Sequence, residues 1–272
     1  MSNLLIVGGG KMGGALLGGL INRGTYAPAA VVVVEPLAER RLELEEMYPG
    51  LRTVAAPEPG LLDGGEGTPL PGAVLAVKPD QAEAACRVLG AVGVRRVLSI
   101  VTGVPCQRLE SALGGEPVVI RVVPNTPSLV GAGVSAMAGG SFVTSKELEW
   151  AEVLLSSIGT VVRLPERLLD AVTGVSGSGP AYFFLVAEAL IEAGVQMGLT
   201  RDVSRTLVVQ TMAGSAALLE ETGREPASLR ADVTSPAGTT AAGVRALEGR
   251  AVRSAFMEAV AAATERARNL QR

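Results

Sequence analysis

The most constraining feature of this chain is a series of short runs of Val, Ile and Leu separated by helical patterns. Apolar runs without polar alternation are typical of strands buried on both faces, and helices between them predict a parallel sheet. Glycine or proline stands at nearly every junction, and the glycine-rich segment Ala56–Gly72 is predicted to be a loop insertion. The strand candidates lie in NLLIVG, AVVVVEP, AVLAVKP, RRVLSIVTG and PVVIRVVPNTP.

From about Leu164 the strand pattern stops, and the remaining sequence predicts only helices. We therefore predict a Rossmann-type α/β domain with a doubly wound parallel sheet in residues 1–163, and an all-α domain in residues 164–272. The predicted helix limits are Pro180 to Gly198, Thr200 to Thr222 with Gly223 as the stop, and about Ala227–Val233, followed by two more helices.

The first two of these helices are apolar around most of their circumference, as in YFFLVAEALIEAGV and TLVVQTMAGSAALL. A helix of this kind must be buried, yet a domain of about 110 residues has a limited interior. We therefore expect the helical domain to pack against a second copy of the chain.

Several classes of function are excluded by what the sequence lacks. The chain has no histidine, which rules out Ser-His-Asp and Cys-His catalysis and, without any CxxC motif, argues against a metal site. Two cysteines, Cys86 and Cys106, do not make a disulfide framework, and the chain starts without a recognisable leader segment, so a cytoplasmic location is expected. A net charge of −3 with interspersed signs predicts neither nucleic-acid nor membrane binding.

A glycine-rich turn follows the first predicted strand and opens the first predicted helix. It fits the pattern G-x-G-x-x-G, in which glycines allow a tight turn and a close approach of the backbone to a pyrophosphate at the helix start. The alternative is a turn required only by packing. The candidate cofactor-binding residues are Gly8, Gly9, Gly10, Lys11, Met12 and Gly13.

Glu35 ends the second predicted strand, 22 residues after Gly13. This spacing fits the acidic residue that accepts hydrogen bonds from the ribose hydroxyls of a dinucleotide. A carboxylate there should repel a 2′-phosphate, which favours NADH mildly over NADPH, although Arg40 and Arg41 lie close enough in sequence to reach a phosphate. The alternative is a solvated carboxylate at a strand end.

The segment AVKPDQ follows the third predicted strand, at the sheet edge where ligands bind in this fold. Lys78 can hold a phosphate or ribose there, or can be plain loop surface. The candidate cofactor contacts in this segment are Ala76, Val77, Lys78 and Pro79.

Near the C-terminus, DVTSPAGTTAAGVRALE places more small and hydroxyl residues before a helix than one helix cap requires. The excess predicts a binding site; the alternative is a helix start with surplus caps.

Taken together, these segments show that the chain resembles the pyrroline-5-carboxylate reductase family over essentially its whole length. The matching segments are GGGKMGGAL, AVKP, SIVTGV, RVVPNTP, DAVTGVSGSGPAYFFLVAEALIEAGVQMGL and LRADVTSPAGTTAAGVRALE. The resemblance implies NADPH- or NADH-dependent reduction of 1-pyrroline-5-carboxylate to L-proline. It also implies an all-α dimerisation domain that intertwines with its partner, giving a homodimer and, further, a homodecamer.

The resemblance also implies roles for individual residues. The substrate carboxylate is expected at the free N–H groups of a helix start formed by Gly238 and Thr239, with hydroxyl contacts from Ser235 and Thr239. Thr240 is expected to face the imine nitrogen as the catalytic residue. Further candidates are Ser176 and Ser178 for the substrate, where the alternative is a tight entry of small residues into the helix at Pro180. Val101 and Asn125 are candidates for the cofactor, where Asn125 could instead stabilise a turn.

The sequence departs from the family at VAAPEPG, where the family usually has an asparagine on the adenosine side. Two rival classes of protein share part of this pattern. The β-hydroxyacid dehydrogenases use a lysine in their helical half as an acid, but this chain has no lysine after Lys146. A nucleotide sensor with an inactive site would not need the SPAGTT loop.

Overall fold

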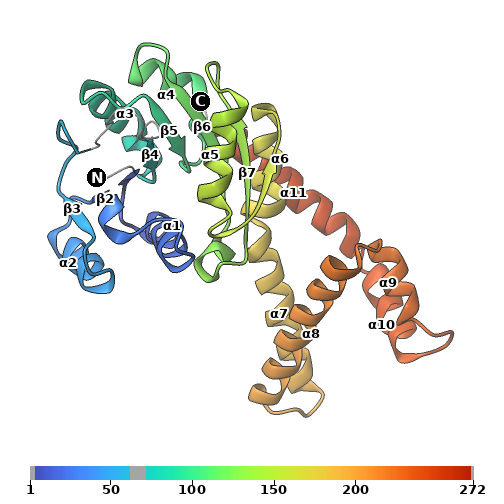
Figure 1. Cartoon of the computed structure of the whole chain (residues 1–272). Helices are drawn as coiled ribbons and strands as arrows, with labels where there is room; N and C mark the ends of the chain where they lie inside the picture. Colours follow the sequence, from blue (N-terminus) through green and yellow to red (C-terminus); the bar gives the residue numbers. More distant parts are fainter. Residues whose placement is uncertain (1–3, 62–71, 271–272) are drawn as a thin grey trace. The chain divides into compact units, whose positions relative to one another are not determined.

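The computed structural model describes residues 4–61 and 72–270 (Figure 1). The chain divides into two compact units: Met1–Ser178 together with Ala262–Arg272, and Gly179–Ala261. The predicted domain boundary after residue 163 remains a prediction.

The described strands form one eight-stranded sheet in the first unit, in the order β3-β2-β1-β4-β5-β6-β7-β8. The first six strands are all parallel, and their order is that of a Rossmann fold. The strands are β1 (Leu4–Val7), β2 (Val31–Val34), β3 (Arg52–Val54), β4 (Gly72–Leu75), β5 (Arg96–Ser99), β6 (Val118–Val123), β7 (Gly133–Gly139) and β8 (Gly159–Arg163).

Helices cover both faces of this sheet, and alternate strand residues point to opposite layers. In β1, Leu4 and Ile6 pack in one core with helices α1, α2 and α5, while Leu5 and Val7 pack in the other with α3 and α4. The five helices are α1 (Lys11–Asn22), α2 (Ala38–Met47), α3 (Ala82–Ala91), α4 (Cys106–Leu113) and α5 (Ser145–Leu155).

The doubly wound parallel sheet predicted from the apolar runs is confirmed for the strands of that pattern. The edge of the sheet differs, because β7 runs antiparallel to β6 and β8 runs parallel to β7. The sequence GVSAMAG of β7 consists mostly of small residues and carries no strong strand signal. Of the predicted loop insertion Ala56–Gly72, residues 62–71 lie outside the described residues.

After β8 the first unit continues with a short 3-10 turn (Glu166–Leu168), helix α6 (Leu169–Val172) and a π-helical turn (Thr173–Gly177). A buried guanidinium attaches this segment to the sheet: Arg121 on β6, 3% exposed, lies 3.2 Å from Glu166 Oε1 and 3.7 Å from Asp170 Oδ1. Burial of an arginine requires such partners, and the pair of carboxylates provides them.

The second unit is helical, as predicted. Thr200 caps α8 by accepting the N–H of Val203, and Gly223 ends that helix with φ 59°, both as the sequence indicates. Pro180 lies in the first turn of α7, as predicted, and Ser178 alone separates α7 from the π-helical turn. The helices are α7 (Gly179–Gln196), α8 (Arg201–Thr222), α9 (Pro226–Asp232), α10 (Thr239–Glu248) and α11 (Val252–Asn269), the last of which continues into the first unit from Ala262.

Helices α7 and α8 expose large apolar side chains, including Phe183 (65%) and Phe184 (68%) on α7 and Leu207 (54%) on α8. Among the described residues, one helical stretch, Glu166–Gln196, is long and apolar enough to cross a membrane by length and composition alone. Core helices pass the same test, so this finding by itself is weak evidence for a membrane.

Candidate functional site

The glycine turn after β1 packs closely against the chain's own backbone, at positions where only glycine fits. Gly8 has φ 107°, and a Cβ on it would lie 2.5 Å from the carbonyl oxygen of Ala76. A Cβ on Gly13 would overlap the carbonyl oxygen of Gly8. Gly10 is the N-cap of α1, and within the described part of the chain no side chain caps this helix. The N–H groups in the first turn of α1 are therefore free of side-chain caps and face the glycine-rich turn, where a pyrophosphate binds in this fold.

Glu35 at the end of β2 is 7% exposed, so it is not a solvated strand-end carboxylate. Its Oε2 accepts the N–H of Gly9 at 2.9 Å and its Oε1 accepts the N–H of Leu37 at 3.0 Å. Each oxygen of a carboxylate can accept two hydrogen bonds, so both retain capacity for ribose hydroxyls. Glu35 thus joins the glycine turn to the β2–α2 turn as well as facing the expected ribose position.

Two arginines lie around the same turn. Arg40 Nε donates to the carbonyl oxygen of Gly9 at 2.8 Å, and its Nη1 pairs with Glu43 at 2.7 Å. Arg41 Nη1 donates to the backbone carbonyl of Glu35 at 2.8 Å. Both guanidinium groups are therefore held beside Glu35, where a 2′-phosphate would lie.

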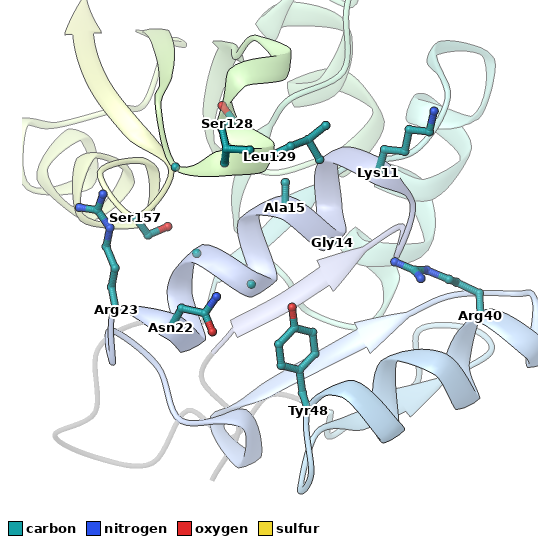
Figure 2. Close-up of a pocket in the computed structure, with 14 residues that line it drawn as sticks. Lys11, Gly14, Ala15, Asn22, Arg23, Arg40, Tyr48, Ser128, Leu129 and Ser157 are labelled. Atoms are coloured by element: carbon teal, nitrogen blue, oxygen red, sulfur yellow. The ribbon is translucent and has the colours of Figure 1, made fainter. Parts of the chain in front are cut away.

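A cavity of about 680 Å³ runs along the outer face of α1 (Figure 2). Lys11 and Arg40 lie at the end where α1 begins, and Asn22 and Arg23 lie at the other end. Tyr48 lines the side formed by the end of α2. The cationic groups nearest the glycine turn can hold phosphate, which fits NADH or NADPH at this edge.

The other cofactor candidates lie after neighbouring strands of the same sheet edge. Ala76 N–H donates to the carbonyl oxygen of Val7, which places the AVKP segment against the glycine turn, and Lys78 is exposed. Val101 is 2% exposed and packs in the core, so only its backbone can face a ligand. The structure thus brings Gly8–Gly13, Glu35 and Ala76–Pro79 together.

Asn125, after β6, has both ends of its side-chain amide in use. Its Oδ1 accepts the N–H of Val134 at 2.9 Å, and its Nδ2 donates to the carbonyl oxygen of Ser176 at 3.2 Å. The turn-stabilising alternative therefore has direct structural support. Ser176 and Ser178 lie at the π-helical turn, where the hydroxyl of Ser176 donates back to the carbonyl of Val172.

The substrate candidates of the second unit surround the start of α10. Gly238 is its N-cap, and among the residues described no side chain caps it, so the local hydroxyl groups are not used as surplus caps. A Cβ on Gly238 would overlap Ser235 Oγ, and Ala237 adopts φ 59°, a left-handed conformation that is strained for alanine. The backbone N–H groups at Thr239 and Thr240 begin the helix and can receive an anion.

Two arginines near α10 in sequence are already paired with carboxylates. Arg224 pairs with Asp232 at 2.7 Å, and Arg230 lies 3.7 Å from Glu248. An acid bound at this helix start would therefore rely on backbone N–H groups and hydroxyls rather than on these guanidinium groups.

The cofactor candidates and the α10 residues belong to different compact units. Ser176 and Ser178 are in the first unit with the cofactor candidates, while Ser235, Gly238, Thr239 and Thr240 are in the second. The meeting of the two groups at one reaction centre is a proposal.

Neither cysteine is suited to nucleophilic chemistry. Both thiols are free and buried, and burial raises the pKa of Cys86 to about 12 and raises the pKa of Cys106 as well. Thiols with such pKa values remain protonated at neutral pH and are poor nucleophiles. Within residues 4–61 and 72–270, no group of three or more Cys, Asp or Glu side chains could hold a metal ion.

The sequence did not predict three hydrogen bonds at the site. These are the bonds from Leu37 N–H to Glu35, from Arg40 to the carbonyl of Gly9, and from the Asn125 side chain to the carbonyl of Ser176. The first two depend on how the β2–α2 turn folds against the glycine turn, and no sequence pattern signals them. The third had a signal in Pro180, whose missing N–H leaves the carbonyl four residues earlier without its α-helical donor.

The sheet order, the glycine turn and the acidic end of β2 define a dinucleotide-dependent oxidoreductase. Two family models match the chain, pyrroline-5-carboxylate reductase dimerisation over residues 166–270 and NADP oxidoreductase, coenzyme F420-dependent, over residues 3–103. The chain is 43% identical to a pyrroline-5-carboxylate reductase of Synechocystis over 97% of both chains. It is 40% identical to the Mycobacterium tuberculosis enzyme of the same name, over 100% of this chain and 97% of that one.

Solved structures agree. A pyrroline-5-carboxylate reductase from Coxiella burnetii superposes with a TM-score of 0.89 at 34% identity, covering 100% of this chain and 99% of that one. The Plasmodium falciparum pyrroline carboxylate reductase with NADP bound gives 0.84 at 29% identity, covering 100% and 98%. The chain belongs to the pyrroline-5-carboxylate reductase family.

Proposed function

We propose that the chain reduces 1-pyrroline-5-carboxylate to L-proline with NADPH or NADH, the final step of proline biosynthesis. Full-length similarity to enzymes of that name supports the reaction. The observation that carries the site assignment is the start of α10, where Gly238 has no side-chain cap among the described residues and Ser235, Thr239 and Thr240 cluster.

On the cofactor side, the glycine turn and the start of α1 hold the pyrophosphate, while Glu35 orients the adenosine ribose. When bound, the reduced nicotinamide supplies a hydride to the carbon of the C=N bond. The start of α1 supports this assignment: no side chain among the described residues caps it, and a Cβ on its N-cap Gly10 would meet nothing within 4 Å, so a pyrophosphate can approach the N–H groups.

On the substrate side, the N–H groups at the start of α10 bind the carboxylate, with hydroxyl bonds from Ser235 and Thr239. Thr240 faces the imine nitrogen. Its hydroxyl is far too weak an acid to lead a proton transfer at neutral pH. The imine therefore binds already protonated or takes a proton from water through Thr240, and orientation provides most of the rate enhancement.

The test is oxidation of NADH and NADPH on addition of 1-pyrroline-5-carboxylate, with proline or thioproline at high pH for the reverse direction. Thr240→Ala should lower kcat/KM by roughly 10- to 1000-fold, as for loss of one positioned donor. Thr240→Ser, which keeps the hydroxyl, is the matched control. A Thr240→Ala enzyme with unchanged kcat/KM would refute the role of Thr240, and an inactive wild-type chain would refute the function.

The dimerisation model over residues 166–270 supports self-association through the helical domain. We propose a homodimer in which α7 and α8 bury Phe183, Phe184 and Leu207 against the partner, with a homodecamer of five such dimers as a further assembly. Sedimentation should show a dimer or a multiple of it, and Phe184→Asp should shift the protein towards monomer. An unchanged assembly in Phe184→Asp would remove this face from the interface.

The same face accounts for the apolar stretch Glu166–Gln196 without a membrane, since Pro180, Glu188 and Glu192 interrupt its apolar sequence. We accordingly propose a cytoplasmic enzyme that binds neither membrane nor nucleic acid, supported by the interspersed charges and the two free, buried cysteines. Fractionation that found the protein in membranes would contradict this.

A further inference from the structure

The π-helical turn Thr173–Gly177 is followed by Ser178 and then by α7, whose second residue is Pro180. In an α-helix the carbonyl of residue 176 would accept the N–H of residue 180. Residue 180 is a proline, which has no N–H and whose ring crowds the carbonyl four residues earlier. The chain widens here instead, and Ser178 N–H donates to the carbonyl of Thr173 at 2.8 Å, five residues back.

The Ser176 carbonyl receives its hydrogen bond from a side chain far away in sequence. Asn125 Nδ2 donates to Ser176 O at 3.2 Å, across 51 residues. This bond supplies the donor that Pro180 lacks.

The other end of the Asn125 amide is fixed by the sheet. Strands β6 and β7 pair antiparallel with Val123 opposite Ala136, and continuing that register places Asn125 opposite Val134. The backbone carbonyl of Asn125 accepts the N–H of Ser128 instead, at 3.1 Å, so its side-chain Oδ1 takes the Val134 N–H at 2.9 Å. The side-chain amide of Asn125 can accept at one end and donate at the other, as this arrangement requires.

We propose that Asn125 is a positioning residue that holds the π-helical turn, and with it Ser176 and Ser178, in the conformation that binds the imine substrate. This inference rests on the proposed function, which places those serines at the substrate. Asn125 acts through Ser176 O and Val134 N–H, and its amide has no role in holding the dinucleotide. The Asn125 bond is needed because Pro180 has no N–H to donate to the carbonyl of Ser176.

The experiment is a double-mutant cycle in the full-length protein. Asn125→Asp keeps the acceptor for Val134 but places a carboxylate against the carbonyl of Ser176. It should lower kcat/KM for the imine about tenfold or more, the effect of losing one hydrogen bond, while the dissociation constant for NADPH stays within about twofold. Asn269→Asp, an exposed asparagine in the same compact unit, is the charge-matched control and should change neither quantity.

Pro180→Ala restores an N–H at residue 180. In that background the loss caused by Asn125→Asp should shrink at least about threefold, because Ser176 O has a donor within its own helix. Additive losses within about twofold would overturn the inference, as would a weakening of NADPH binding as large as the loss in kcat/KM, which would mean direct cofactor contact.

If Pro180→Ala does not fold, as judged by circular dichroism and thermal melting, the comparison of Asn125→Asp with Asn269→Asp decides. A loss confined to imine turnover supports the inference, and unchanged turnover overturns it. Failure of the proposed function is distinguishable from both outcomes, because then the wild-type chain itself would not oxidise NADPH with the imine.

Discussion

Replacing Glu35 by glutamine tests how the chain distinguishes its two cofactors. The carboxylate is 7% exposed and is held by the N–H groups of Gly9 and Leu37 at 2.9 and 3.0 Å. Those bonds keep its charge at the end of β2, where the 2′-position of the adenosine ribose is expected. A 2′-phosphate about 6 Å away would be repelled by roughly 3 kcal/mol per unit charge at an effective dielectric of about 20.

Solvent at this sheet edge, together with Arg40 and Arg41, reduces that repulsion. We therefore expect Glu35→Gln to shift the ratio of dissociation constants towards NADPH by roughly tenfold, about 1.4 kcal/mol. Glutamine retains an acceptor for Gly9 N–H but turns a donor towards Leu37 N–H, so the free energy of unfolding should fall by about 1 kcal/mol.

The assay is nicotinamide fluorescence on titration with NADH and NADPH, followed by kcat/KM with each. Glu46→Gln, at an exposed position on helix α2, is the matched control for the change in charge. A ratio that stays within about twofold of wild type, with the protein folded, would refute the role of the Glu35 charge in cofactor choice.

Three further predictions concern the turn, a buried thiol and the substrate loop. Gly13→Ala should abolish dinucleotide binding in fluorescence titrations, because its Cβ would overlap the Gly8 carbonyl; wild-type affinity would contradict this. Burial raises the Cys86 pKa from 9.0 to about 12, so the stability that the neutral thiol provides below pH 9.0 is lost as pH rises towards 12. In denaturant titrations, the free energy of unfolding should fall less steeply between pH 9.0 and about 12 in Cys86→Ala than in wild type. Parallel pH profiles for the two proteins would contradict this. Ala237→Gly relieves a φ of 59° and should raise the unfolding free energy by up to about 1 kcal/mol, whereas destabilisation would show that the strain is absent.

Most of the sheet could be predicted because its signal is local. The run VVVV of β2 and the glycine turn after β1 specify buried parallel strands and a helix start without reference to the rest of the chain. Strand β7 could not be predicted, because its small residues become a strand only through pairing with β6 and β8. The helix ends at Thr200 and Gly223 were also predictable from local sequence, because a single residue type determines each cap.

The candidate site divides in the same way. Residue types and their spacing predicted that Gly8–Gly13, Glu35 and the start of α10 belong to binding sites. They could not show that Glu35 binds the backbone of Gly9, or that Asn125 completes a turn broken by Pro180, because each bond joins segments 26 or 51 residues apart. Contacts of that kind are set by tertiary packing, which a single sequence does not display.

The most direct test of the account is a crystal structure of the chain with L-proline and oxidised dinucleotide bound. It should show the proline carboxylate accepting N–H groups at Thr239 and Thr240, the ring nitrogen beside the Thr240 hydroxyl, and the nicotinamide against the ring. Proline bound away from residues 235–240, with the dinucleotide in place on the glycine turn, would contradict the account.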